Sequence, residues 1–326
     1  MRVAINGLGR IGRLVFKIGL EKGLNIVAIN DLTDSKSLVY LLKYDTVYGN
    51  YDKKVSAGKG FINVGGKKVK MFSEPDPEKL PWKDLKVDLV IEATGAFTEK
   101  EKAKKHIKAG AKRVVITANS KDSDIMVVIG ANENKIKKKH KVIAMASCTT
   151  NCLVPVAKVL EDSFGIKKAF MNTVHAYTVS QGLVDMPKKK LRRGRAAAEN
   201  IVPTTSGATT ATCVIIPSLK GKMDGLALRV PVACGSIVDF VCQLKKKVTR
   251  DQLNNAFKRA ANGKLKGILQ YTEEELVSSD IIENPHTSVV DGRLTQVIGD
   301  LVKVLAWYDN EYAYSAKIVD LVRMLK

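Results

Sequence analysis

Short apolar runs alternate with longer amphipathic stretches through the first half of this chain. The runs that predict strands cover residues 3–5, 25–30, 87–92, 113–116, 125–129 and 142–146. Residues 11–20 have helical periodicity, and Thr98 and Glu101 have the spacing of a capping box that would open a lysine-rich helix running to about residue 109. Strands that alternate with helices form a parallel sheet with helices on both faces. We therefore predict a doubly wound, Rossmann-type α/β domain.

The second half has a different pattern, in which strand-like runs follow one another with few helices between them. These runs cover residues 169–174, 212–216, 225–232 and 236–244. Thr249 and Gln252 can cap one helix, and residues 316–325 have helical periodicity. This pattern predicts an α+β domain with a largely antiparallel sheet. We place the two domains at residues 1–147 and 148–309, with residues 310–326 returning to the first.

A glycine-rich turn joins the first predicted strand to the first predicted helix. Residues 6–12 read Asn-Gly-Leu-Gly-Arg-Ile-Gly, which contains the G-x-G-x-x-G spacing of dinucleotide sites. In such a turn Gly7 permits the bend, Gly9 lets the backbone approach a pyrophosphate, and Gly12 allows close helix packing. The start of the helix then offers N–H groups to the phosphates. Asp31 ends the next strand, where a carboxylate would bind ribose hydroxyls and repel a 2′-phosphate, so NAD is favoured over NADP.

The most reactive groups stand at the change between the two patterns. Residues 147–152 read Ser-Cys-Thr-Thr-Asn-Cys, with Cys148 at the start of a predicted helix, and His175 ends a later strand. A helix N-terminus and a neighbouring imidazolium both favour a thiolate, so we expect the pKa of Cys148 to be lowered. The pair predicts a thiolate nucleophile that works beside a nicotinamide.

The other cysteines are interpreted as packing residues. Cys152 would lie on the same helix face as Cys148, and no second Cys/His pair has the spacing of a metal site. Cys213, Cys234 and Cys242 fall in apolar runs that we expect to be core strands. An odd number of cysteines, five in all, argues against a disulfide scaffold and for a reducing compartment.

Composition and charge narrow the class of protein. The 326 residues suffice for about two domains, 45% of them are hydrophobic, and no apolar run reaches the roughly 20 residues of a membrane span. Met1 leads directly into a strand, so we expect no targeting peptide and a cytoplasmic protein. The net charge of +21 would attract anionic substrates or nucleic acid. The densest basic run, residues 135–141, lacks the aromatic residues that stack on bases, so we interpret it as solvated surface.

Five segments resemble those of the phosphorylating NAD-dependent glyceraldehyde-3-phosphate dehydrogenases, that is, the family that forms an acyl phosphate. They are residues 6–12, 147–152, 173–175, 191–193 and 307–311. The resemblance covers nearly the whole chain, and it implies an α/β cofactor domain, an antiparallel-sheet catalytic domain, a place in glycolysis and a homotetramer.

The resemblance also implies a reaction path. Cys148 would attack the aldehyde of glyceraldehyde 3-phosphate to give a thiohemiacetal, with His175 as the base. The backbone N–H of Cys148 and the His175 imidazole would hold the oxyanion. Hydride transfer to NAD would leave a thioester, and inorganic phosphate would convert that thioester to 1,3-bisphosphoglycerate.

Binding residues are implied in the same way. The substrate phosphate would bind Thr178, Arg229 and one of Arg192 or Arg193, of which we name Arg193 although the spacing does not distinguish them. The attacking phosphate would bind Ser147, Thr149, Ser206 and Gly207, with Arg229 close to both pockets. The NAD contacts would be Gly7, Gly9, Arg10, Ile11, Gly12, Asp31, Thr94, Gly95, Thr117 and Asn310.

The chain departs from the family pattern at several positions. Ser206 stands where threonine is common, and the hydroxyl is kept. Pro75 replaces a frequent arginine, and residues 119–120 are Asn-Ser instead of Pro-Ala, which puts the adenosine contacts in doubt. Residues 179–180 are Val-Ser where Gly-Asp is common, which puts substrate preference in doubt. Three rival functions stay open: an erythrose-4-phosphate dehydrogenase, a basic nucleic acid binding protein on the same scaffold, and a thiol hydrolase.

Overall fold

The computed structural model describes residues 1–325, and the chain divides into two compact units. The first unit comprises Met1–Val127, Asn134–Ala146 and the chain from Ser315 onward. The second comprises Val128–Glu133 and Ser147–Tyr314. Within residues 1–325, the structure has no helix that is both long and apolar enough to cross a membrane.

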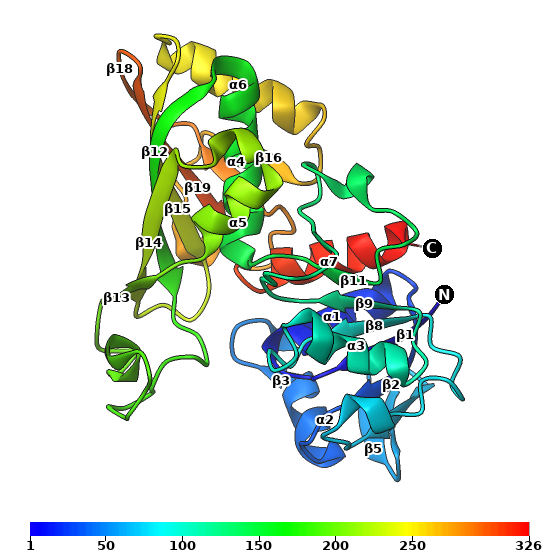
Figure 1. Ribbon diagram of the computed structural model, residues 1–326. Helices are drawn as coiled ribbons and strands as arrows, with labels where there is room; N and C mark the ends of the chain where they lie inside the picture. The colour runs from blue at the N-terminus through cyan, green and yellow to red at the C-terminus, as the bar shows by residue number, and fades with distance from the viewer. Residues whose placement is uncertain (326) are drawn as a thin grey trace. The chain divides into compact units, whose positions relative to one another are not determined.

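The first unit is built on a nine-stranded sheet (Figure 1). In spatial order its strands are β10 (Ile125–Met126), β11 (Val142–Ala144), β9 (Arg113–Ile116), β8 (Leu89–Glu92), β1 (Arg2–Asn6), β2 (Asn25–Asn30), β7 (Lys67–Phe72), β6 (Phe61–Val64) and β5 (Val55–Gly58). The strands from β10 to β7 pair in parallel, as predicted, while β5, β6 and β7 add an antiparallel edge that the sequence analysis did not find. Strands β10 and β11 are shorter than predicted. A separate hairpin joins β3 (Tyr44–Asp45) to β4 (Gly49–Asn50).

Helices α1 (Arg10–Glu21), α2 (Ser35–Lys43) and α3 (Lys100–Lys108) belong to this unit. The buried face of α1, which includes Phe16, gives it the predicted amphipathic character. The predicted capping box on α3 is wrong, because the helix begins at Lys100 and its N-cap is Glu99, one residue after Thr98. The Asp122 carboxylate accepts a hydrogen bond from the first helical N–H, that of Lys100, at 3.0 Å. Asp122, which is distant in sequence, therefore caps the helix in place of the predicted pair Thr98 and Glu101.

The second unit holds an eight-stranded sheet that is largely antiparallel, as predicted. In spatial order its strands are β13 (Val202–Thr205), β14 (Met223–Val230), β12 (Ile166–Ala176), β15 (Ser236–Leu244), β19 (Leu301–Tyr308), β17 (Ser288–Asp291) and β16 (Leu269–Thr272), with β18 (Gln296–Ile298) beside β19. Two neighbouring pairs are parallel, β12 with β14 and β16 with β17. The parallel pair β12–β14 matters below because it sets His175 beside Arg229.

Helices α4 (Cys148–Phe164), α5 (Ala208–Ile215) and α6 (Arg250–Asn262) pack on this sheet (Figure 1). Their core includes Leu160, Phe240 and Phe257, all fully buried. The capping box of Thr249 and Gln252 is confirmed at the start of α6. Helix α7 (Tyr312–Met324) begins earlier than predicted. The short 3-10 helices are η1 (Pro77–Lys79), η2 (Glu133–Lys135), η3 (Leu191–Gly194), η4 (Pro217–Leu219) and η5 (Ser278–Ile281).

The strand predicted at residues 212–216 is wrong, because this segment ends helix α5. Ala208, Ala211, Thr212 and Ile215 are buried, and their spacing of three and four residues is that of one helix face. The Thr212 hydroxyl also donates a hydrogen bond to the Ala208 carbonyl at 2.8 Å. The β-branched residues at 212–216 suggest a strand when they are read alone, but the alanines before them complete the helical pattern.

The five cysteines all have free thiols. Cys152 is fully buried in the core of the second unit, which confirms its interpretation as a packing residue. Cys242 lies buried on β15 as expected. The placement of the other two was wrong: Cys213 is half-buried on helix α5, and Cys234 is buried but outside the strands.

Candidate active site and dinucleotide site

A sharp bend in the backbone sets Cys148 at the first position of helix α4. Ala146, two residues before Cys148, has a φ of 55°, a left-handed conformation that residues other than glycine rarely adopt. Ser147 is the N-cap, and its hydroxyl accepts a hydrogen bond from the Thr150 N–H at 3.1 Å. The thiol therefore sits in the first helical turn, where N–H groups lack partners within the helix.

The second unit brings the thiol and the predicted imidazole together. Cys148 Sγ lies 3.5 Å from His175 Nε2, and His175 is 3% exposed near the end of β12. Register places Arg229 directly opposite His175 on the parallel neighbour β14. Arg229 Nη1 is 2.8 Å from His175 Nδ1 and donates to the Ala176 carbonyl at 2.9 Å. A thiol, an imidazole and a guanidinium thus form one chain of contacts.

Tyr308 contacts the elements that carry Cys148 and His175, although no role was predicted for it. Its hydroxyl lies 2.9 Å from Thr149 Oγ1 and 2.8 Å from Thr173 Oγ1, and its ring meets that of His175 edge-on. Tyr308 is 1% exposed, so these contacts are shielded from water. Its phenol links the start of α4 to β12, the two elements that carry Cys148 and His175.

The charge balance of the thiol differs from the expectation. Burial raises the pKa of the Cys148 thiol, while Arg229 and the Thr149 N–H act in the opposite direction. Burial, and then the charge of Arg229, lower the pKa of His175 to about 3. The thiolate of Cys148 and the imidazolium of His175 are therefore each disfavoured when taken alone. At 3.5 Å a thiolate and an imidazolium attract each other by about 5 kcal/mol at an effective dielectric constant of about 20, so the thiolate depends on a positive neighbour.

The residues predicted for the two anion pockets lie in the second unit. Arg193, on η3, donates from Nε to Thr204 Oγ1 at 2.9 Å and from Nη1 to Ser180 Oγ at 3.4 Å. Ser180 Oγ is in turn 2.8 Å from Thr178 Oγ1. Arg192 is exposed, so Arg193 is the arginine held among these hydroxyls. Ser180 was noted in the sequence only as a departure.

The remaining predicted residues of this unit have local contacts. Ser206 Oγ accepts from the Ala208 N–H at 3.2 Å, and Gly207 is the N-cap of α5, which packs against α4. The Asn310 side-chain oxygen accepts from Ser236 Oγ at 2.9 Å and from the Gly235 N–H at 3.2 Å.

The glycine-rich turn of the first unit has the backbone shape that was predicted. Gly7 has a φ of 93°, and a Cβ there would come within 2.8 Å of Thr94. A Cβ on Gly12 would overlap the carbonyl oxygen of Gly7, so only glycine allows α1 to pack this closely. A Cβ on Gly9, the N-cap of α1, would meet open space. A bound group can therefore approach the backbone at Gly9.

The other predicted dinucleotide residues follow the carboxyl ends of neighbouring parallel strands. Asp31 follows β2, Thr94 follows β8 and Thr117 follows β9, which is where doubly wound sheets bind ligands. The Asp31 carboxylate accepts hydrogen bonds from the Leu8 N–H at 2.6 Å and the Thr33 N–H at 2.8 Å. Arg10 forms a 2.6 Å ion pair with Asp45.

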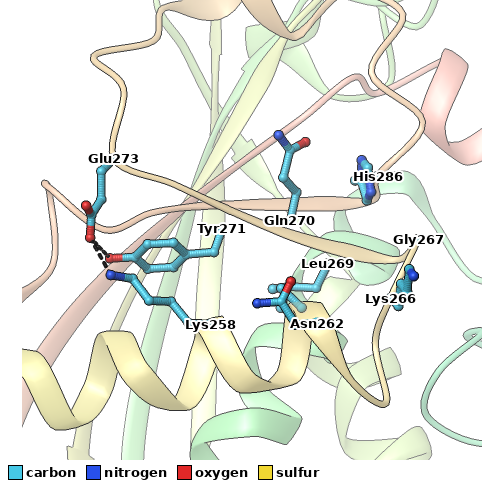
Figure 2. Close-up of a pocket in the computed structure, with 10 residues that line it drawn as sticks. Lys258, Asn262, Lys266, Gly267, Leu269, Gln270, Tyr271, Glu273 and His286 are labelled. Atoms are coloured by element: carbon cyan, nitrogen blue, oxygen red, sulfur yellow. Dashed lines mark hydrogen bonds and ion pairs between the residues drawn. The ribbon is translucent and has the colours of Figure 1, made fainter.

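A separate groove of about 450 Å³ on the second unit is lined from α6 and β16 (Figure 2). Lys258 pairs with Glu273 at 2.8 Å, and the Tyr271 hydroxyl donates to the same carboxylate at 2.9 Å. None of the predicted site residues lines this groove.

Comparison with known proteins shows the family to which the chain belongs. The family model described as the NAD binding domain of glyceraldehyde 3-phosphate dehydrogenase matches residues 1–100, and that of the C-terminal domain matches residues 147–310. Together with the fold, these matches define an NAD-dependent oxidoreductase. The chain is 53% identical to glyceraldehyde-3-phosphate dehydrogenase 2 of Streptomyces avermitilis, with 98% of this chain and 97% of that protein covered. It is 52% identical to glyceraldehyde-3-phosphate dehydrogenase 2 of Bacillus subtilis (99% and 96%) and 51% identical to glyceraldehyde-3-phosphate dehydrogenase of Geobacillus stearothermophilus (98% and 97%). It belongs to the glyceraldehyde-3-phosphate dehydrogenase family.

The dependence of the thiolate on its neighbours can be measured. Replacing His175 with asparagine removes the imidazole whose Nε2 lies 3.5 Å from Sγ, so the pKa of Cys148 rises and less thiolate is present at neutral pH. We expect iodoacetamide to alkylate the variant at least about tenfold more slowly at pH 7, with the midpoint of the rate–pH curve moved to higher pH. Cys148→Ser gives the background from the other thiols. An unchanged midpoint would show that His175 does not support the thiolate.

Proposed function

We propose that this protein oxidises glyceraldehyde 3-phosphate to 1,3-bisphosphoglycerate, using NAD as hydride acceptor and inorganic phosphate as the second substrate. The observation that carries the proposal is the contact between Cys148 and His175 beside the Arg229 guanidinium. A thiol that can form a thioester, next to a cation that can bind phosphate, suits oxidation followed by acyl transfer to phosphate. The full-length similarity to glyceraldehyde-3-phosphate dehydrogenases supports the same substrate.

The covalent path uses the second unit. The Cys148 thiolate attacks the aldehyde carbon and forms a C–S bond, and the carbonyl oxygen takes the proton held by His175. The Cys148 N–H and the His175 imidazole hold this thiohemiacetal oxygen. When bound, NAD would supply the acceptor for the hydride of this carbon. His175 takes the hydroxyl proton as the C=O bond re-forms, which leaves a thioester. A phosphate oxygen then attacks the thioester carbonyl, the C–S bond breaks, and the Cys148 thiolate is released with the acyl phosphate.

The two anion pockets orient these steps. We assign the substrate phosphate to Thr178, Arg193 and Arg229, because Arg193 and Thr178 are joined through one serine hydroxyl and Arg229 stands against His175. The planar arginine forks suit bidentate contacts with phosphate oxygens. We assign the attacking phosphate to the hydroxyls and backbone N–H groups at the starts of α4 and α5, namely Ser147, Thr149, Ser206 and Gly207.

The first unit would hold NAD. Its glycine-rich turn and the start of α1 would bind the pyrophosphate. Asp31 would bind the adenosine ribose in place of its present contacts with backbone N–H groups. In the second unit the Asn310 side-chain oxygen is already bonded, so its amide N–H₂ group would bind the nicotinamide carboxamide. We accordingly propose residues 1–147 with 310–326 as the NAD-binding domain and 148–309 as the catalytic domain, and the five free thiols favour a reducing compartment, the cytoplasm.

The reaction is tested by following NADH absorbance. We expect NADH to form when glyceraldehyde 3-phosphate, NAD and inorganic phosphate are all present, to fall to the amount of one turnover per site without phosphate, and to vanish in Cys148→Ser. Preference for erythrose 4-phosphate would contradict the triose assignment, and product formation without NAD would indicate a thiol hydrolase. Inactivity with each substrate, together with a salt-sensitive shift of unrelated nucleic acid, would favour the binding-protein alternative.

The role of Arg193 has its own test. Hydrogen bonds to a charged group contribute about 1.5–3 kcal/mol, so Arg193→Ala should raise KM for glyceraldehyde 3-phosphate by about tenfold to a hundredfold. Arg192→Ala, at an exposed neighbour, should stay near wild type. With unphosphorylated glyceraldehyde the two variants should behave alike, since that substrate lacks the group that Arg193 binds. A larger loss in Arg192→Ala would reverse the assignment.

We also propose a homotetramer. Val179, Leu183 and Leu191 are 88%, 80% and 83% exposed within residues 177–201, and Phe170 on the face of the second sheet is 72% exposed. Exposed apolar side chains on a chain of +21 favour a protein–protein contact over a nucleic acid site, and we infer that other copies of the chain cover them.

Light scattering should give a mass of four times the 35.7 kDa of one chain. Leu183→Asp should lower that mass, because a carboxylate would be buried in the contact. Val277→Asp changes a side chain that is 58% exposed elsewhere and should leave the mass unaltered. A monomeric wild-type protein would contradict the proposal.

A further inference from the structure

Glu92, the last residue of β8, is a buried carboxylate with an unusual set of partners. Its side chain is fully inaccessible, a state that carboxylates reach only when their oxygens are well satisfied. One oxygen accepts from the N–H of Thr94 at 2.8 Å and from the Thr94 hydroxyl. The other accepts from Asn6 Nδ2 at 2.6 Å and faces His106 Nε2 at 3.0 Å. This arrangement satisfies the ionised form, because each partner can donate.

The proton on His106 is fixed by a tryptophan. Trp82 and His106 are both fully buried, and Trp82 Nε1 lies 3.0 Å from His106 Nδ1. An indole N–H can only donate, so Nδ1 must accept and the imidazole proton must be on Nε2. That proton points at the Glu92 carboxylate. Trp82 therefore sets the tautomer that makes His106 a donor to Glu92.

The carboxylate ties together the strand ends from which the dinucleotide turn starts. Asn6 is the last residue of β1 and precedes Gly7, and its side-chain oxygen accepts from Asn30 Nδ2, at the end of β2, at 2.8 Å. Thr94 is the residue against which Gly7 packs so closely that a Cβ would lie 2.8 Å away. Glu92 thus fixes both the residue before the turn and the residue that supports it.

We propose that Trp82, His106 and Glu92 form a positioning relay for the NAD site, in which a buried carboxylate held by an imidazole of fixed tautomer sets the shape of the turn at Gly7. The relay touches neither NAD nor the reacting atoms. It rests on the proposed function in that the turn at Gly7 is taken to bind NAD. A network that only stabilised the fold would change melting temperature without changing NAD affinity in the folded protein.

Glu92→Gln in the full chain tests the relay. Either orientation of the new amide sets an N–H₂ group against donors, so Thr94 or Asn6 must move. We expect Kd for NAD, measured by calorimetry, to rise about tenfold or more, which corresponds to one misplaced buried hydrogen bond. KM for NAD should rise with it, while kcat at saturating NAD stays within about threefold. Alkylation of Cys148 in the absence of NAD should be unchanged, since that chemistry belongs to the second unit.

Asp291→Asn is a matched control. Asp291 is also a buried carboxylate, 2% exposed, with an oxygen that accepts from an indole N–H, that of Trp307, at 3.4 Å, but it lies on β17 of the second unit. Its amide variant should keep the wild-type Kd for NAD. Equal loss of NAD affinity in the two variants would show a general effect of buried carboxylates and overturn the relay.

A pair of variants at His106 decides the matter even if Glu92→Gln does not fold. His106→Gln can still donate to Glu92 and accept from Trp82, whereas His106→Leu can do neither. We expect His106→Gln to keep most of the NAD affinity and His106→Leu to lose it. Wild-type affinity in Glu92→Gln, or equal affinities in the two His106 variants, would overturn the relay. Failure of the wild-type protein to bind NAD would instead overturn the proposed function.

Discussion

A half-buried thiolate is stabilised by positive charge nearby, and in the second unit that charge is set beside Cys148 by the packing of its elements. Cys148 belongs to a helix and His175 to a strand, and only packing of α4 on the sheet brings Sγ and Nε2 to 3.5 Å. The parallel pairing of β12 and β14 then adds Arg229 on the far side of the imidazole. The shape of the sheet therefore determines the electrostatics of the thiol as directly as the side chains do.

Both units hold their site residues with a buried polar group placed between strand or helix ends. In the second unit the phenol of Tyr308 joins Thr149 to Thr173. In the first unit the carboxylate of Glu92 joins Asn6 to Thr94. Such groups are strong only when fully satisfied, because each unpaired partner in a low-dielectric interior is costly. They restrict the elements around them to one arrangement, which is what a site of fixed geometry needs.

Sequence patterns sufficed for the parts of the fold that repeat. The parallel sheet, the antiparallel sheet, the turn at Gly7 and the start of α4 at Cys148 follow from periodicity and from residue types with local preferences. The same reasoning failed at residues 212–216, where β-branched residues sit on a helix because the alanines before them complete its buried face. It failed again at Thr98, where Asp122 from a distant loop caps the helix.

The candidate site was predictable to a similar depth. Cys148 and His175 are rare residue types that stand at the start of a predicted helix and at the end of a predicted strand, so the sequence indicated both. The choice between Arg192 and Arg193 depends on which side chain the fold turns towards Thr204, and spacing holds no information on that. Tyr308 and Glu92 end apolar strands, where a sequence pattern treats them as part of the core. Their polar atoms gain meaning only from partners that are distant in sequence.

The backbone at Ala146 has a consequence for how the nucleophile is presented. A φ of 55° on an alanine is maintained only because the surrounding structure holds it, and Ala146 is fully buried. The methyl group leaves this residue fewer accessible conformations than a glycine would have. The entropy of ordering the segment before Cys148 is thus lost once, when the chain folds, and not again at each encounter with an aldehyde. The Cys148 thiol is therefore already oriented before each substrate binds.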